Sequence, residues 1–187
     1  MKIIDILIDA GHFLGLRDEI VTLNNITEEN ESFVLETDEK IAKLFNLVKF
    51  SIKEMCSNYV PIINSVKIQT DNKEYQLNKL ESFIKVKNAT QNEQMVKYKI
   101  INRNIIFTED GEYEINYFTF PKITSVFDEI DYLSDLSPDV IVFGLCAYFS
   151  LAYGLFEEFE NFHSQYVEKA ESLKGVKNFN LPCRRWE

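Results

Sequence analysis

The chain has 187 residues, of which 45% are hydrophobic and 13% aromatic, and its formal net charge is −10. This composition is typical of a folded chain, and the length suffices for one domain or for one domain with a small insertion. The acidic balance argues against sequence-specific binding of nucleic acid, because an acidic surface repels phosphate. It does not exclude a protein that lets DNA pass without binding it tightly.

The cysteines and the N-terminus indicate a cytoplasmic product without a leader. Cys56, Cys146 and Cys183 are odd in number and far apart, which argues against a disulfide framework or a zinc knuckle. Asp5 and Asp9 interrupt the first apolar stretch, so we expect no signal peptide. No apolar run approaches the roughly 20 residues that cross a bilayer, so we expect no membrane association.

The N-terminal third has helical periodicity on both sides of a polar stretch. Residues 2–14 predict a short helix, whereas residues 15–37, rich in Asn, Glu and Thr, predict a loop that can hold a short helical turn. Asp38 is placed to cap a second helix, which should run to about Tyr59 because Pro61 prevents extension. Its apolar residues follow helical spacing: Ile41, Leu44, Phe45, Val48, Ile52 and Met55.

Alternating apolar and polar residues from 64 to 120 predict a compact antiparallel sheet, as a small sandwich or barrel. Strands are expected over 66–70, around Tyr75 and Leu77, and over 82–87, 95–100, 104–108 and 113–117. Asp110-Gly111 predicts a tight hairpin between the last two strands, since both central residues of such a turn need positive φ.

A helical hairpin is predicted after the sheet. Ser137-Pro138-Asp139 has the residues of a helix start, with Ser as N-cap, Pro in the first turn and an acid at the positive end of the dipole. The helix that follows is apolar almost all round, which predicts burial, and Gly154 ends it. A second helix from about Phe156 to Lys174 follows a link short enough to make the pair antiparallel.

The pattern as a whole predicts an α+β fold. Residues 1–63 and 121–175 should form one helical bundle that includes the C-terminal hairpin. Residues 64–120 should form an inserted small antiparallel β sheet. Residues 176–187 should form an extended C-terminal arm.

The only tryptophan lies in the peptide LPCRRWE, residues 181–187. Trp and Arg often supply most of the binding energy at interfaces, and a proline stiffens a segment before it binds. We interpret the peptide as a docking arm whose binding residues are Leu181, Pro182, Arg184, Arg185 and Trp186. The alternative is a frayed tail whose Trp packs back onto its own domain.

No motif in the sequence indicates catalysis. His12 and His163 lack the convergent ligands of a metal site, and Cys146 lies in an apolar helix where a thiol is usually inert. A Walker loop and a dinucleotide fingerprint are both absent. Lys97-Tyr98-Lys99 could bind single-stranded nucleic acid, but the acidic balance favours an ordinary solvent face. We therefore expect no enzyme, no metal and no cofactor.

Several segments are similar to one family of phage proteins. Residues 127–131 (FDEID), 136–140 (LSPDV), 147–158 (AYFSLAYGLFEE) and 181–186 (LPCRRW) resemble the head-to-tail adaptors of tailed bacteriophages. The likeness is greatest to the tail adaptors, or tail accessory factors, of short-tailed phages and related prophage proteins. Residue-level likeness covers about 127–186, and likeness of layout covers most of the chain.

The resemblance implies a structural virion protein in the neck between head and tail, made in the host cytoplasm. It implies a homo-oligomeric ring, a dodecamer, bound beneath the portal protein ring. The arm would reach into the portal, the β part would contact the next tail or neck component, and acidic residues would line a channel through which DNA passes. A second hypothesis stays open, that of a small cytosolic protein-binding module or regulator with an exposed peptide tail.

Overall fold

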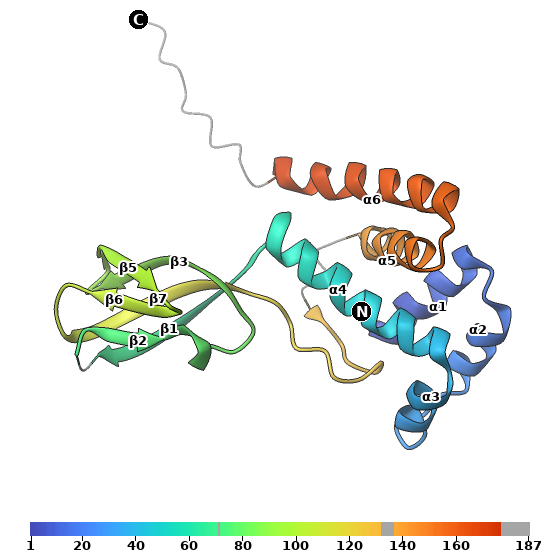
Figure 1. Cartoon of the computed structure of the whole chain (residues 1–187), viewed down its shortest axis with the longest axis horizontal. Coiled ribbons are helices and arrows are strands. Elements are labelled where there is room, and N and C mark those ends of the chain that lie inside the picture. Colours follow the sequence, from blue (N-terminus) through green and yellow to red (C-terminus); the bar gives the residue numbers. More distant parts are fainter. Residues whose placement is uncertain (71, 132–136, 177–187) are drawn as a thin grey trace, which may run out of the picture. The chain divides into compact units, whose positions relative to one another are not determined.

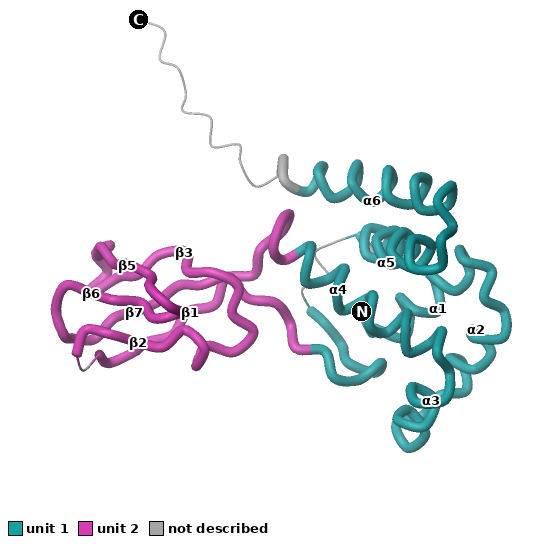
Figure 2. The backbone as a smooth tube through the Cα atoms, viewed as in Figure 1, with its two compact units in different colours: residues 1–55, 123–187 teal, residues 56–122 magenta. Residues whose placement is uncertain are grey.

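The computed structural model describes residues 1–70, 72–131 and 137–176, and it confirms the predicted α+β fold (Figure 1). The chain divides into a helical unit, residues 1–55 and 123 onward, and a β unit, residues 56–122 (Figure 2). The helices are α1 (Ile3–Leu14), α2 (Arg17–Asn24), α3 (Glu31–Thr37), α4 (Glu39–Asn58), α5 (Pro138–Ala152) and α6 (Phe156–Val176). The strands are β1 (Ile62–Thr70), β2 (Glu74–Gln76), β3 (Phe83–Gln91), β4 (Gln94–Met95), β5 (Tyr98–Ile101), β6 (Asn104–Phe107) and β7 (Gly111–Thr119).

The core of the helical unit is built by α1, α4, α5 and α6. The predicted stripe of α4, from Ile41 to Met55, is buried at every position. Asp38 caps this helix as predicted, since its Oδ1 accepts hydrogen bonds of 3.0 Å from the backbone N–H groups of Lys40 and Ile41. On α6, Tyr166 is completely buried and lies against Gly144 of α5, where an added Cβ would be 3.1 Å from the Tyr166 ring. Glycine at 144 therefore lets the two helices pack closely.

The loop that leads into α5 is tied to the N-terminus. The Asp128 carboxylate accepts hydrogen bonds from the backbone N–H groups of Thr124 (2.6 Å) and Ser125 (3.0 Å), which fold the loop into a turn. The carbonyls of this loop then accept bonds from the first N–H groups of α1, from Ile3 to Asp128 O and from Ile4 to Val126 O. The loop thus satisfies N–H groups that a helix N-terminus leaves without partners.

The prediction of a loop over residues 15–37 is wrong. This stretch forms α2 and α3, two helices of eight and seven residues. Each is too short to show a repeating apolar stripe, and each has few buried side chains. The α3 helix is held by its first residue, because the Glu31 carboxylate accepts bonds from Ser125 Oγ (2.7 Å) and from the backbone N–H of Val126 (2.8 Å). Tertiary contacts, not local periodicity, therefore fix this segment.

The β unit has two antiparallel sheets around a core of its own. The larger sheet has the strand order β1-β7-β3-β4 and the smaller has the order β2-β6-β5. Their shared core includes Ile105 and Ile115, both completely buried, and the stacked rings of Phe107 and Tyr113, whose centroids are 3.8 Å apart. Two packed sheets with inward-facing apolar residues agree with the predicted small sandwich.

The hairpin predicted at Asp110-Gly111 is wrong. β6 pairs with β2 and β5, whereas β7 begins at Gly111 and pairs with β1 and β3, so these residues connect the two sheets. The tight turns occur instead at Asn92-Glu93 and Asn102-Arg103, where φ is 49° and 64° in each pair. Both turns have the positive φ values of a type I′ turn. Neither contains glycine, and in each the first position is Asn, which tolerates positive φ better than most residues.

Helices α5 and α6 form the predicted antiparallel hairpin. Gly154 has a φ of 73°, the N–H of Leu155 donates to Ser150 O (2.9 Å) and the N–H of Gly154 donates to Leu151 O (3.1 Å). These two bonds are those of a Schellman motif, which ends α5. At the other end of α5, Ser137 occupies the N-cap position, but its side chain makes no capping hydrogen bond. The structure confirms that Ser137 is the N-cap residue of α5, but it does not show the predicted hydrogen bond from the backbone to the Ser137 side chain.

Candidate partner-binding surfaces

The predicted docking arm lies outside the described residues. Leu181, Pro182, Arg184, Arg185 and Trp186 all follow Val176, the last residue that the structure describes. Their role therefore stays a prediction. The described residues instead present two exposed apolar surfaces, one in each unit.

The first surface is the tip of the α5–α6 hairpin, which we call the hairpin tip and define as Leu151, Tyr153, Leu155 and Phe156. The exposed fractions of Leu151, Tyr153 and Leu155 are 42–44%, and that of Phe156 is 66%. The Schellman motif accounts for an apolar residue at position 155. It does not account for three further exposed apolar side chains around that position. The prediction that α5 is buried all round holds for most of the helix, including Phe149 and Ser150, and fails at its last two residues, Leu151 and Ala152.

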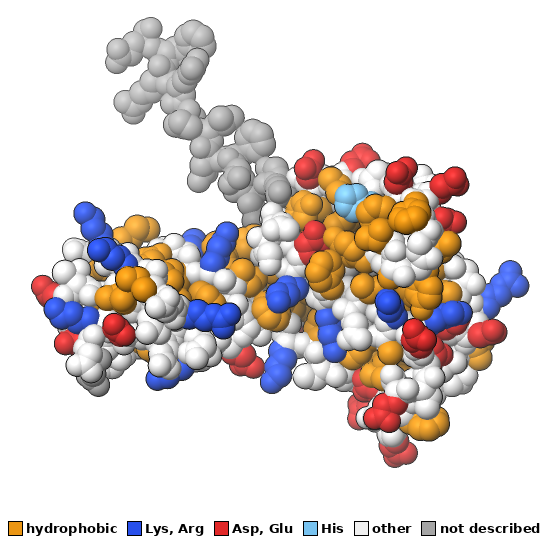
Figure 3. Space-filling view, viewed as in Figure 1, with side chains coloured by type: hydrophobic (Ala, Val, Ile, Leu, Met, Phe, Trp, Pro, Cys, Tyr) orange, Lys and Arg blue, Asp and Glu red, His pale blue; other side chains and the backbone are white. Residues whose placement is uncertain are grey.

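Aromatic rings extend this apolar surface along the helices. Phe13 at the end of α1 is 56% exposed, although its ring centroid lies 5.4 Å from that of Phe143 and 6.4 Å from that of Phe162. Figure 3 shows hydrophobic side chains gathered on one face of the helical unit, with acidic side chains along the margin. Clustered exposed apolar side chains with a polar rim are typical of protein interaction sites.

Charge is distributed unequally between the two units. Residues 56–122 contain nine Lys or Arg and eight Asp or Glu, a formal net charge of +1. The rest of the chain contains 11 Lys or Arg and 22 Asp or Glu, a formal net charge of −11. The acidity of the protein therefore belongs to the helical unit and the residues that follow it.

Several of these carboxylates are used inside the helical unit. The Glu54 carboxylate on α4 accepts hydrogen bonds from the hydroxyl groups of Tyr148 on α5 and Tyr166 on α6 (2.9 Å for Tyr166), which joins three helices. Glu19 on α2 pairs with Lys40 on α4, with 2.6 Å between Oε1 and Nζ. The hydrogen bond from Lys40 lowers the pKa of Glu19 more than its burial raises it, and the same bond raises the pKa of Lys40. These acids tie helices together.

Asp128, part of the segment that resembles the phage adaptors, is also an internal group. Burial would raise its pKa, but the hydrogen bonds from the backbone of Thr124 and Ser125 outweigh this effect, and the pKa is lowered. The carboxylate thus stays charged while it holds the loop before α5. The adjacent Glu129 lies near the N-terminal ammonium of Met1, with 3.6 Å between Oε1 and N. Asp128 is therefore a structural group of this loop.

The second surface is formed by strand β5, at the outer edge of the smaller sheet, and by the end of β4, at the outer edge of the larger sheet. We call it the β5 edge and define it as Met95, Ile100 and Ile101 with the basic residues Lys97, Lys99 and Arg103. Met95 is 78% exposed and the two isoleucines are 50% exposed. The strand order places β5 at the outside of its sheet. All three basic side chains are exposed.

The geometry of β5 argues against the nucleic-acid reading of Lys97-Tyr98-Lys99. Tyr98 pairs in register with the buried Phe107 and packs against the core of the β unit. Lys99, the next residue, points to the opposite face because side chains alternate along a strand. The tyrosine ring is therefore not a stacking platform between two lysines, as the binding of single-stranded nucleic acid would require.

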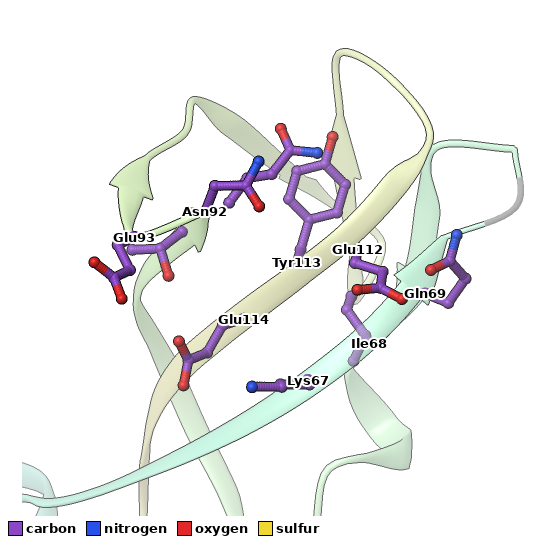
Figure 4. A pocket seen from close by; sticks show the side chains of 10 residues that line it. Lys67, Ile68, Gln69, Asn92, Glu93, Glu112, Tyr113 and Glu114 are labelled. Carbon is purple, nitrogen blue, oxygen red and sulfur yellow. The ribbon is translucent and has the colours of Figure 1, made fainter.

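An open groove crosses the larger sheet of the β unit (Figure 4). It is lined by Lys67 and its neighbours on β1, by the turn at Asn92-Glu93, and by Glu112 to Glu114 on β7. Glu114 already accepts a hydrogen bond of 2.7 Å from Ser65 Oγ. The acidic side chains do not converge, and within the described ranges no group of three or more His, Cys, Asp or Glu side chains could hold a metal ion. We assign the groove no binding role.

His163 and Cys146 have packing roles in the helical unit, whereas His12 is exposed. The His163 ring lies 5.0 Å from that of Phe159 and 6.4 Å from that of Tyr166 on the same helix. Burial raises the pKa of the Cys146 thiol to about 12, so a thiolate is not available there. In the part of the chain that the structure describes, no helix is both long and apolar enough to cross a membrane.

Neither a protein-family model nor a curated protein matches the chain. The likeness to phage adaptors therefore depends on the segments quoted above. Sequence reasoning missed both surfaces described here. The signal for the hairpin tip was present in the apolar residues on both sides of Gly154. The β5 edge could not be found before the strand order was known, because exposure of Ile100 and Ile101 depends on which strand is outermost.

Proposed function

We propose that this chain is the subunit of a head-to-tail adaptor ring in a tailed phage or prophage. In this proposal it is a structural virion protein in the neck, attached beneath the portal ring, and it forms part of the DNA channel. The observation that carries the proposal is the hairpin tip. Residues 151, 153, 155 and 156 lie within the longest segment that resembles the adaptors, and they are exposed, whereas the apolar stripe of α4 in the same unit is buried. A surface of this kind is typical of a protein interaction site.

The distribution of charge supports the same proposal. A channel that passes DNA benefits from a lining that does not adhere to phosphate. The helical unit and the residues that follow it carry a formal net charge of −11, although part of this charge is held in internal contacts such as that of Glu54. The near-neutral β unit would then be the part that contacts the next tail or neck component.

The experiment that tests the proposal uses purified portal from the same genome. Deletion of residues 181–187, or Trp186→Ala alone, should leave the circular dichroism spectrum native and prevent the joining of the two rings. Truncation of one hot-spot residue commonly costs about 2 kcal/mol or more, and in a ring the losses of many arms multiply. Cys183→Ser is the matched control, since it changes the same peptide without removing Arg or Trp.

Two outcomes would contradict this assignment. Normal joining by the truncated chain would show that residues 181–187 are not the docking arm. A truncated chain that cannot fold would support the alternative, in which Trp186 packs back onto its own domain. Absence of genes for portal, terminase or capsid near the gene for this chain would favour a cytosolic binding module or regulator over a virion protein.

A further inference from the structure

We propose that copies of this chain associate head-to-tail, with the hairpin tip of one copy bound to the β5 edge of the next. This inference deepens the proposed ring by naming the surfaces that join its subunits. It rests on the proposed adaptor ring in one respect, namely that the binding partner is a second copy of this chain. The residues of both surfaces lie within the part of the chain that the structure describes, and none belongs to the predicted docking arm.

Both surfaces expose apolar side chains to solvent. Phe156 on the hairpin tip is 66% exposed and Met95 on the β5 edge is 78% exposed. Each unit already has a closed core, so neither surface is needed for folding of its own unit. Burial of such area contributes roughly 25 cal/mol per Å², which favours association of the two surfaces over their exposure to water.

The two surfaces carry charges of opposite sign. The hairpin tip leads into the first turn of α6, which carries Glu157 and Glu158, followed by Glu160. The β5 edge carries the exposed basic residues Lys97, Lys99 and Arg103 in the same stretch of chain as its apolar residues, and Lys99 shares one face of β5 with Ile101. Within the described residues, no ion pair involves any of these six side chains. Opposite charges around two apolar centres fix the orientation of an interface and raise the rate of association.

Basic residues near the hairpin tip do not cancel this pattern. Lys43 on α4 lies over the Tyr153 ring, with 5.7 Å between Nζ and the ring centroid. Lys40, one turn earlier, is paired with Glu19. The acids at the start of α6 interact favourably with the positive end of the helix dipole. That interaction explains their position on α6 but does not neutralise them toward a partner.

The same charges disfavour pairing of like with like. Two hairpin tips would bring their glutamates together, and two β5 edges would bring together Lys97 and Lys99, an arrangement that edge strands use to prevent edge-to-edge pairing. The remaining combination joins different surfaces on successive copies. A heterologous contact of this kind generates a ring when its rotation closes and a filament when it does not.

Cross-linking of full-length chains tests the contact without portal. All variants carry Cys183→Ser, which removes the third cysteine of the chain. Cys56 and Cys146 can stay because they are buried. A tagged Phe156→Cys chain is mixed at high concentration with an untagged Ile101→Cys chain and oxidised. We expect the mixed dimer to exceed both homodimers by at least about tenfold, since like surfaces repel.

Matched controls come from exposed apolar residues outside the two surfaces. Phe33→Cys replaces a side chain as exposed as Phe156 (67% against 66%), and Ile63→Cys replaces one as exposed as Ile101 (48% against 50%). These controls should give only the background level of cross-links. Equal yields from the proposed and control pairs would overturn the inference, and so would homodimers in excess of the mixed dimer.

Charge reversal provides a second, independent test by sedimentation. Lys97→Glu with Lys99→Glu should weaken self-association at least about tenfold, as should Glu157→Lys with Glu158→Lys. Combination of all four substitutions in one chain should restore association, because the complementarity is re-established with opposite sign. A combined variant that stays as weak as either pair would overturn the inference. If the wild-type chain does not bind portal but still gives the β5-edge cross-link, the portal-binding role is contradicted and this inference stands.

Discussion

The helical unit and the β unit differ in how they use charged residues. In the helical unit, carboxylates form internal contacts: Glu54 joins three helices, Glu31 holds α3, and Asp128 folds the loop before α5. In the β unit, the core consists of apolar and aromatic side chains, carboxylate contacts such as that of Glu114 with Ser65 join exposed positions on paired strands, and the basic residues of the β5 edge lie at the surface. A net charge of −11 on the helical unit therefore overstates the charge that a partner would meet.

This difference separates two kinds of charge substitution. Replacement of Glu54, Glu31 or Glu19 should alter stability, because each of these carboxylates forms a contact between two elements of the fold. Replacement of Lys97 or of Lys99 should alter association and leave stability almost unchanged, since exposed charges far from such contacts contribute little to folding. The predictions below test the comparison, beginning with the largest expected effect.

Tyr166→Ala should destabilise the helical unit by about 3–5 kcal/mol, the range typical of a large buried aromatic side chain. Tyr166 is 0% exposed, it packs against Gly144, and its hydroxyl donates to Glu54. Urea unfolding monitored by circular dichroism measures the change. Tyr166→Phe keeps the ring and should cost only about 1 kcal/mol, the usual value of one hydrogen bond. If both variants cost the same, packing at Gly144 is not the main contribution of this residue.

Glu19→Gln should destabilise the protein at neutral pH and have little effect in acid. The folded pKa of Glu19 is lowered from its ordinary value of 4.5, so its charge stabilises the fold above that value. This contribution is lost as the pH falls through the lower folded pKa. Unfolding of the wild type and of Glu19→Gln should thus give a difference at pH 7 that disappears below the folded pKa. Glu28→Gln, at an exposed site between α2 and α3, is the control and should show no such difference.

Glu93→Gly should stabilise the β unit by about 0.5–1 kcal/mol. Glu93 has a φ of 64°, a conformation that costs little for glycine and more for residues with a side chain. Asn-Gly is the preferred pair for a type I′ turn. Thermal unfolding measures the gain, and Lys87→Gly, in the interior of β3, should lower stability by a similar amount. A destabilised Glu93→Gly variant would show that the Glu93 side chain has a role beyond the turn.

Periodicity predicted the elements that pack through long regular faces. The stripe of α4 from Ile41 to Met55 and the alternation of β7 at Tyr113, Ile115 and Tyr117 were legible in the sequence, and all of these side chains are buried. The segments that were missed depend on distant partners. α3 is held by Glu31 through a loop more than 90 residues later in the chain, and Gly111 pairs with Thr70 and not with β6.

The candidate site was less predictable than the fold, for a physical reason. The apolar character of residues 151–156 was visible, but exposure depends on where neighbouring helices end, which local sequence does not specify. The β5 edge likewise depends on strand order. Helix caps are an intermediate case, because residue type predicts the position of a cap and not whether the side chain makes the bond. The two predicted caps of this chain illustrate that case.

The smallest effect is expected at Ser137, where the sequence alone predicts a loss of about 1 kcal/mol on substitution by alanine. The Ser137 side chain makes no capping bond, whereas Asp38 accepts two, from Lys40 and Ile41. Ser137→Ala should therefore change the free energy of unfolding by less than about 0.5 kcal/mol, and Asp38→Ala should cost about 1 kcal/mol. Both values can be measured by urea unfolding of the full chain. Equal costs at the two positions would mean that the Ser137 hydroxyl caps α5 in solution. A smaller cost at Ser137 would show that Pro138, whose fixed φ suits the first turn of a helix, is sufficient to begin α5.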